Sequence, residues 1–386
     1  MNMANANNDD RDEEELLRHY FNLGYTYNEI LAFFKEYHDI EISLSTIKRK
    51  VKAIGLQRRN KDYDVNELRN RVRDMLGGPA NLLGYRSVWH NLQRNGYRVP
   101  RIAVAQILRE LDPEGVENRA RHRLKRRVYQ NIGPGYAWHC DGYDKLKPYG
   151  FAIHGCIDGY SRKVLWLHVT RSNNFPSNIA AYFLEAVESF GGCPVDLITD
   201  SGTENGIMAG IQAFFRDSPD SHRYVPSPRN QRIEGWWSYL RKSHSSWWMN
   251  FFKDLCSQGV VDLENPLHTE CLWFCFSSLL QFNLDDVKIH WNTHYIRSSR
   301  FDTVRGRPNS LFYLPTLHGG TPDLLLPIPE NEIQYAKAHL VDYDDYSLYQ
   351  EYFQYVVTNR NIQMPSNWRE AVALFNKLME ISLSEL

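Results

Sequence analysis

The sequence predicts a mixed α/β domain in the middle of the chain, preceded by short helical units and followed by a helical tail. Between about 137 and 199, apolar segments follow the order strand, strand, strand, helix, strand, which is typical of such a domain. Capped helical patterns precede this region, and helical patterns return after 316. The chain has 386 residues, of which 42% are hydrophobic, enough to bury a core over two or three domains.

Charge is distributed unevenly along the chain, although the formal net charge is only −1. Between Ser43 and Arg127 there are 21 Lys and Arg residues against 8 Asp and Glu residues, a net charge of +13. From Thr316 to Leu386 there are 4 basic and 10 acidic residues, a net charge of −6. The basic segment predicts a polyanionic partner for the first third of the chain.

Residues 1–10 are polar and acidic, and we expect them to form a disordered leader rather than a signal peptide. The longest apolar run, at 271–282, is too short to cross a bilayer, so no membrane partner is expected. The six cysteines lie in apolar stretches, which is typical of reduced thiols in an intracellular protein.

Residues 11–62 are predicted to form a first unit of three helices. An apolar pattern ends at Gly24, and Thr26 followed by Glu29 forms a capping box for the second helix. Ser43 can cap a third helix that is rich in lysine and arginine and closes at Gly55. This outline is typical of a helix-turn-helix, whose last helix contacts DNA.

Residues 63–118 repeat that outline. A helix is expected at 65–76, another at 85–96, and a third with Pro100 at its first helical position. The segment 119–131 follows as a basic linker, with six Arg or Lys residues between Arg119 and Arg127. One basic helix alone is usually a solvated face, but two successive units favour contact with DNA.

Three carboxylates follow in the α/β region. Asp141 and Asp200 each end an apolar strand, and Glu234 is expected in the second turn of a helix that begins near Asn230. Each acid alone is compatible with a turn or helix cap. Together they would repel one another unless a cation neutralised them, and oxygen ligands favour Mg²⁺ or Mn²⁺ in a two-ion site. Asp144 is the alternative to Asp141 as the first ligand.

The segments WHCDGYDKL, ITDSGTENG and SPRNQRIEGWW resemble the three sequence blocks of the integrase core. This is the ribonuclease H-like catalytic domain of retroviral integrases and insertion-sequence transposases, and it also occurs in eukaryotic proteins derived from DNA transposons. The resemblance implies a five-stranded mixed sheet with flanking helices over 132–315, and the residues after it predict an acidic helical region over 316–386. The resemblance also implies that Asp141, Asp200 and Glu234 are the catalytic metal ligands.

The resemblance implies a nuclear enzyme that cleaves DNA phosphodiester bonds and transfers strands, working as a homo-oligomer on DNA. The alternative is a host-adopted copy that binds DNA or protein without catalysis. No cysteine precedes Cys140, so the zinc-binding N-terminal module of retroviral integrases is not expected. The basic residues predicted to contact DNA are Lys48, Arg49, Lys52, Arg101, Arg123, Lys125, Lys145, Arg241 and Lys242.

Other signals have simpler interpretations. His268, Cys271 and Cys275 have a spacing compatible with zinc, but their apolar neighbours favour a buried helical face. The pairs Trp236-Trp237 and Trp247-Trp248 are compatible with stacking on unpaired bases. Adjacent residues cannot share one face of a helix, so at least one member of each pair is expected in the core.

Overall fold

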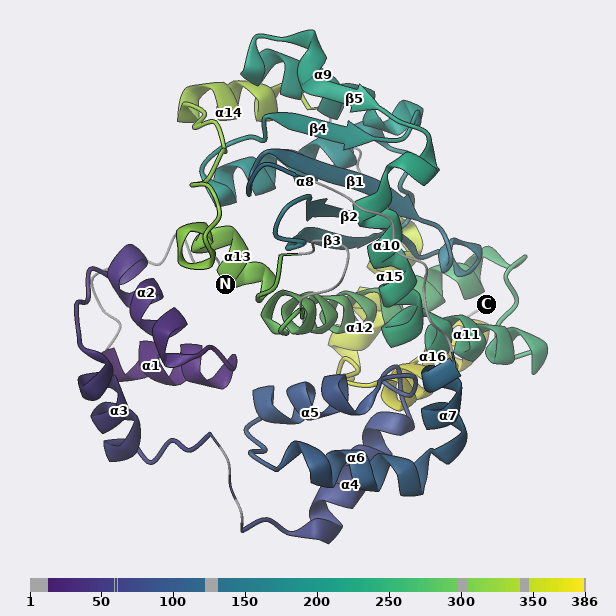
Figure 1. Ribbon diagram of the computed structural model, residues 1–386. Helices are drawn as coiled ribbons and strands as arrows, with labels where there is room; N and C mark the ends of the chain where they lie inside the picture. Colours follow the sequence, from purple (N-terminus) through teal and green to yellow (C-terminus); the bar gives the residue numbers. More distant parts are fainter. Residues whose placement is uncertain are drawn as a thin grey trace.

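A five-stranded mixed sheet forms the centre of the computed structural model, which describes residues 13–58, 60, 62–121, 131–297, 304–340 and 347–384. The strand order is β3-β2-β1-β4-β5, with β1, β2 and β3 antiparallel and with β4 parallel to both β1 and β5 (Figure 1). The strands are β1 (Ala137–Tyr143), β2 (Ala152–Asp158), β3 (Val164–Thr170), β4 (Asp196–Thr199) and β5 (His222–Tyr224). The predicted mixed sheet with flanking helices is confirmed.

Helices α8 (Pro176–Phe190) and α9 (Gly206–Arg216) cover one face of the sheet. Trp138 and Cys140, two positions apart on β1, point into the core on this side, because alternate residues of a strand face the same way. Asp141 and Tyr143 therefore face the opposite side.

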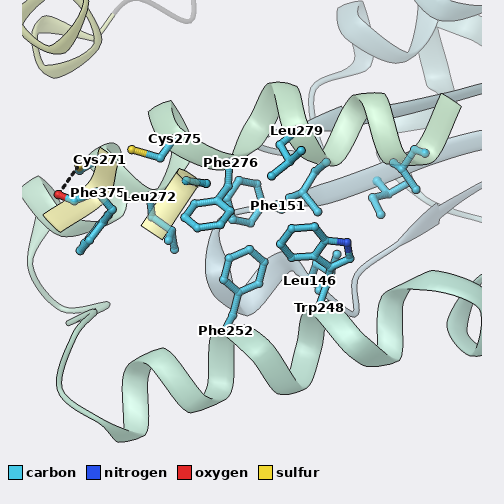
Figure 2. Packing of buried hydrophobic residues seen from close by; sticks show 14 of the residues in the cluster. Leu146, Phe151, Trp248, Phe252, Cys271, Leu272, Cys275, Phe276, Leu279 and Phe375 are labelled. Atoms are coloured by element: carbon cyan, nitrogen blue, oxygen red, sulfur yellow. Dashed lines mark hydrogen bonds between the residues drawn. The ribbon is translucent and has the colours of Figure 1, made fainter. Parts of the chain in front are cut away.

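The opposite face packs against α10 (Gln231–Leu240), α11 (Ser246–Ser257) and the long α12 (Pro266–Thr293). Figure 2 shows the aromatic side chains that fill the space between α11 and α12, with the ring centroids of Phe151 and Phe252 5.2 Å apart. Cys271 and Cys275 are buried in this cluster, as their apolar neighbours predicted.

The two N-terminal helical units are present, each with its own small apolar cluster. The first comprises α1 (Glu13–Asn22), α2 (Tyr27–His38) and α3 (Leu44–Ala53). The capping box is confirmed, because the Thr26 hydroxyl accepts from the Glu29 amide and the Glu29 carboxylate accepts from the Thr26 amide. Ser43 caps α3, also as predicted.

The second unit comprises α4 (Val65–Leu76), α5 (Tyr85–Arg94) and α6 (Arg101–Leu111). Pro100 is the N-cap of α6 rather than its first helical residue, so that expectation was wrong by one position. A further helix, α7 (Pro113–Arg121), continues into the predicted basic linker. The rest of that linker, including Arg123 and Lys125, lies outside the described residues, as does the predicted leader.

The C-terminal region is helical, as expected, and its helices pack on the central domain. They are α14 (Glu330–Ala338), α15 (Leu348–Asn359) and α16 (Trp368–Ser384), and α13 (Pro308–Tyr313) precedes them within the 132–315 region. Phe353 of α15 and Leu378 of α16 belong to the same buried cluster as α12. Across the described ranges, no helix is long and apolar enough to cross a membrane.

Candidate active site

Asp141 and Asp200 are brought to the same level by two neighbouring parallel strands. His139 of β1 is in register with Ile198 of β4, and each acid lies two residues further along the chain. Asp200 directly follows β4, as predicted. Asp141 does not end its strand, however, because β1 continues to Tyr143 and Asp141 pairs with Gly155 of β2.

Helix α10 carries Glu234, which lies in its first turn rather than in the expected second turn. Asn230 precedes the helix and is fully buried. Its amide donates to the Cys140 carbonyl over 2.9 Å, and its carbonyl oxygen lies 2.7 Å from Nδ1 of His139. The residues beside Asp141 in β1 are thus tied directly to the start of the helix that presents Glu234.

Asn230 was not recognised as a site residue from the sequence. The available signal was a polar side chain at the start of a predicted helix, four positions before Glu234. That position normally indicates a helix cap. Only the tertiary structure shows that its amide bonds to β1.

The charges of Asp200 and Glu234 act on Asp141. The pKa of Asp141 is raised to about 7, mainly by burial and also by the negative charges of Asp200 and Glu234, while a hydrogen bond from Trp237 acts in the opposite direction. Such mutual repulsion is relieved when a divalent cation binds between the acids. The oxygen-only donor set fits a hard ion such as Mg²⁺ or Mn²⁺.

Each of these carboxylates also accepts a hydrogen bond from the protein. Trp237 Nε1 donates to Asp141 over 2.9 Å, Asn205 Nδ2 donates to Asp200 over 3.1 Å, and the Ser227 hydroxyl donates to Glu234. Within the part of the chain that the structure describes, no three His, Cys, Asp or Glu side chains are grouped closely enough to hold a metal ion. The acids therefore share one neighbourhood, but they are not assembled into a formed ligand cage.

Asp144, the alternative first ligand, has structural partners. It accepts from Asn173 over 2.7 Å and lies 3.5 Å from the Lys147 ammonium group. Gly142 packs closely against the same asparagine, since a Cβ atom at Gly142 would lie 2.4 Å from Asn173 Nδ2. Asp144 and Asn173 thus support the backbone just after Asp141.

Basic side chains lie near the end of β1. Arg241 and Lys242 are exposed at the start of a π-helical segment, Arg241–Ser245, between α10 and α11. Burial raises the pKa of Tyr143, whereas the charge of Arg241 lowers it. Arg241 is therefore close to the strand that carries Asp141, and Lys145 is exposed just beyond that strand.

The predicted DNA-contacting residues of the helical units are exposed. Lys48, Arg49 and Lys52 lie on the solvent side of α3, and Arg101 is exposed at the start of α6. A cleft of about 870 Å³ separates the two units, and Trp89 and Arg109 are among the residues that line it. Cationic and aromatic side chains of this kind suit a nucleic-acid backbone and its bases.

Three of the four paired tryptophans are core residues rather than exposed base-stacking groups. Trp236 and Trp237 are both buried, as is Trp248. The prediction that at least one member of each pair lies in the core is therefore confirmed. In the Trp236-Trp237 pair both residues lie in the core, because their rings point to different parts of one apolar cluster.

Comparison with known families gives one match that contains this site. Residues 128–318 match the family described as the integrase core domain. Residues 128–318 form an integrase core domain. The integrase core includes all five strands, α10 and the three candidate carboxylates. The domain boundaries expected from the sequence, 132–315 among them, stay predictions.

Among solved structures, this chain is similar to a chain in the cryo-electron microscopy structure of the simian T-cell lymphotropic virus intasome in complex with PP2A regulatory subunit B56 gamma. The two chains are 15% identical, the alignment covers 66% of this chain and 78% of that chain, and the TM-score is 0.31. At this level the similarity supports no conclusion about function. Comparison with curated proteins finds no match to this chain.

Proposed function

We propose that this protein is a transposase- or integrase-like enzyme that binds DNA, cleaves phosphodiester bonds and transfers DNA strands in the presence of Mg²⁺ or Mn²⁺. The observation that carries the proposal is an integrase core in which Asp141, Asp200 and Glu234 lie close enough for their charges to interact. We propose a nuclear location and a homo-oligomer on DNA, because joining two DNA ends requires two sites.

The carboxylates of Asp141, Asp200 and Glu234 would hold the ions. When bound, two such ions activate an attacking oxygen and stabilise the leaving oxygen of a phosphodiester. Glu234 would first exchange its bond with Ser227 for a metal contact. Asn230 maintains the position of α10 on β1, which keeps Glu234 beside Asp141.

The basic residues have a separate role in this proposal. Arg241, Lys242 and Lys145 are exposed near the end of β1, where they would contact the phosphates next to the cleaved bond. The exposed cations of α3 and α6 would bind the flanking duplex. Side chains that contact phosphates position the DNA but do not read its sequence.

Plasmid nicking and oligonucleotide strand transfer in Mg²⁺ or Mn²⁺ test the proposal. Asp141→Asn and Glu234→Gln should each reduce the rate at least about a hundredfold, since each removes a proposed ligand. Asp144→Asn is the matched control and should keep most of the activity, because Asp144 bonds to Asn173 and Lys147. Equal activity in the wild type and Glu234→Gln would contradict the catalytic assignment.

A host-adopted module that binds DNA or protein without cutting is the second candidate. Its specific support is that the acids accept hydrogen bonds from the protein and are not assembled as a ligand group within the described ranges. DNA binding by a wild-type protein that lacks all metal-dependent cleavage would favour this candidate over the enzyme.

A further inference from the structure

Trp237 makes a direct hydrogen bond to the first of the proposed metal ligands. Its indole Nε1 donates to Asp141 Oδ2 over 2.9 Å. Trp237 lies three positions after Glu234 on α10, so both side chains project from neighbouring turns on one side of the helix. One helix therefore supplies a carboxylate and also the donor that contacts a second carboxylate.

The indole ring is seated in a space that the sheet leaves open for it. Gly155 of β2 is the cross-strand partner of Asp141. A Cβ atom at Gly155 would lie 2.8 Å from Cη2 of Trp237, closer than the two atoms can pack. Because Gly155 has no side chain, the indole ring of Trp237 fits beside Asp141. The ring of Tyr143 packs against this indole, with the two ring centroids 5.1 Å apart.

The helix that carries Trp237 is tied to the sheet by further polar bonds. Arg232 Nε donates to the Gly159 carbonyl over 2.7 Å, and Asn230 donates to the Cys140 carbonyl over 2.9 Å. The first bond reaches the residue after β2, and the second reaches the middle of β1. They restrict sliding of α10 along the sheet, so the direction of the indole N–H toward Asp141 is set by the fold.

We propose that Trp237 is a positioning residue that holds one oxygen of the Asp141 carboxylate and would leave the other oxygen available to bind a metal ion. The inference rests on the proposed function, in which Asp141 binds the ion. Outer hydrogen bonds of this kind orient a ligand, and their removal weakens metal binding by about ten- to a hundredfold.

Trp237→Phe tests this, and the neighbouring tryptophan provides a matched control. Trp236 is also buried, and its indole N–H has no hydrogen-bond partner among the residues that the structure describes. Both substitutions replace a buried indole with a phenyl ring on the same helix, but only Trp237→Phe removes a bond to Asp141. If Trp237→Phe does not fold, benzothienylalanine at position 237 keeps the shape of the indole and removes only its N–H.

Mn²⁺ binding to the full chain is measured by isothermal titration calorimetry, with thermal unfolding as a check on folding. We expect the Mn²⁺ dissociation constant to rise about ten- to a hundredfold in Trp237→Phe and less than about threefold in Trp236→Phe. Equal affinity in the two variants would overturn the role of Trp237. If the wild type binds no Mn²⁺, or binds it as tightly as Asp141→Asn does, the proposed function fails as well.

Discussion

Asp141 shows how a single residue depends on distant parts of the chain. Its carboxylate is partly buried, accepts a bond from Trp237 and is affected by the charges of Asp200 and Glu234. None of these partners is nearby in the sequence, since Trp237 lies 96 positions away. The predicted strand and the sequence block identify Asp141 as a candidate ligand, but its raised pKa arises only in the folded chain.

The pKa of Asp141 predicts a pH dependence of stability in metal-free buffer containing EDTA. Between the ordinary Asp pKa of 3.8 and the folded-state value of about 7, the folded protein keeps a proton that the unfolded chain has released. This contribution to the free energy of unfolding is present at low pH and is lost as the pH rises through about 7. Wild type should therefore lose stability relative to Asp141→Asn over this range.

Chemical unfolding of both proteins at about pH 5 and about pH 8 measures the difference. Asp144→Asn serves as the control, because Asp144 is an exposed acid on the same segment. The prediction is contradicted if the free energies of unfolding of the wild type and Asp141→Asn change by the same amount between these two pH values.

At the scale of elements, one glutamate joins the first helical unit to the central domain. Glu29 Oε2 accepts from the Thr26 amide over 2.7 Å as part of the capping box of α2. The same oxygen accepts from Arg307 Nη1 over 2.8 Å, and Arg307 also donates to the Gly24 carbonyl over 2.6 Å. The helix cap predicted from local sequence is also a tertiary contact, 278 positions from its partner.

Glu29→Gln should lower the free energy of unfolding by about 3 kcal/mol, because removing one partner of a buried pair leaves the other charge uncompensated. The side chains are 6% and 14% exposed, for Glu29 and Arg307 respectively. Urea unfolding measures the change. Glu41→Gln is the control and should have no measurable effect, since the Glu41–Lys35 pair in the same unit is exposed to solvent. Equal effects of the two substitutions would refute the prediction.

At the scale of the whole molecule, the segments expected as separate units share contacts. Figure 1 shows α13 lying between the sheet and the first helical unit, and Leu314, which follows α13, belongs to the apolar cluster of that unit. The second unit contacts α12, where Arg94 of α5 lies 2.7 Å from Asp286. The exposed cations of α3 are therefore held at defined positions relative to the candidate active site.

The basic face of α3 predicts a salt-dependent affinity for DNA. Changing Lys48, Arg49 and Lys52 together to glutamine should weaken binding to any duplex sequence. It should also reduce the slope of log affinity against log salt by about 3, or roughly 0.9 per lost phosphate contact. Fluorescence anisotropy at several salt concentrations measures both quantities.

Lys50→Gln is the control for this prediction, since Lys50 lies on the same helix but pairs with Glu13 over 2.5 Å. It should leave the salt slope nearly unchanged. A triple variant with the slope of the wild type would show that α3 does not contact phosphates.

The sequence predicted features that depend on neighbouring residues. The capping box at Thr26, the cap at Ser43 and the helix at 65–76 agree with the structure, because caps and apolar periodicity act within a few residues. The predicted end of β1, at Asp141, was two residues too early, because the length of the strand depends on its pairing with β2. The predicted start of α6 was wrong by only one residue, because Pro100, which is the N-cap, suits both the cap and the first helical position.

By itself, the sequence determined the order of the elements, the mixed α/β class and the three acids of the integrase blocks. Only the tertiary structure decided which donors contact those acids, that Asn230 and Trp237 join α10 to β1, and that Arg307 binds the cap of α2. The physical reason is separation along the chain. Local patterns set backbone conformation, whereas hydrogen bonds and charge interactions across about 90 to 280 positions exist only once the sheet and helices have packed.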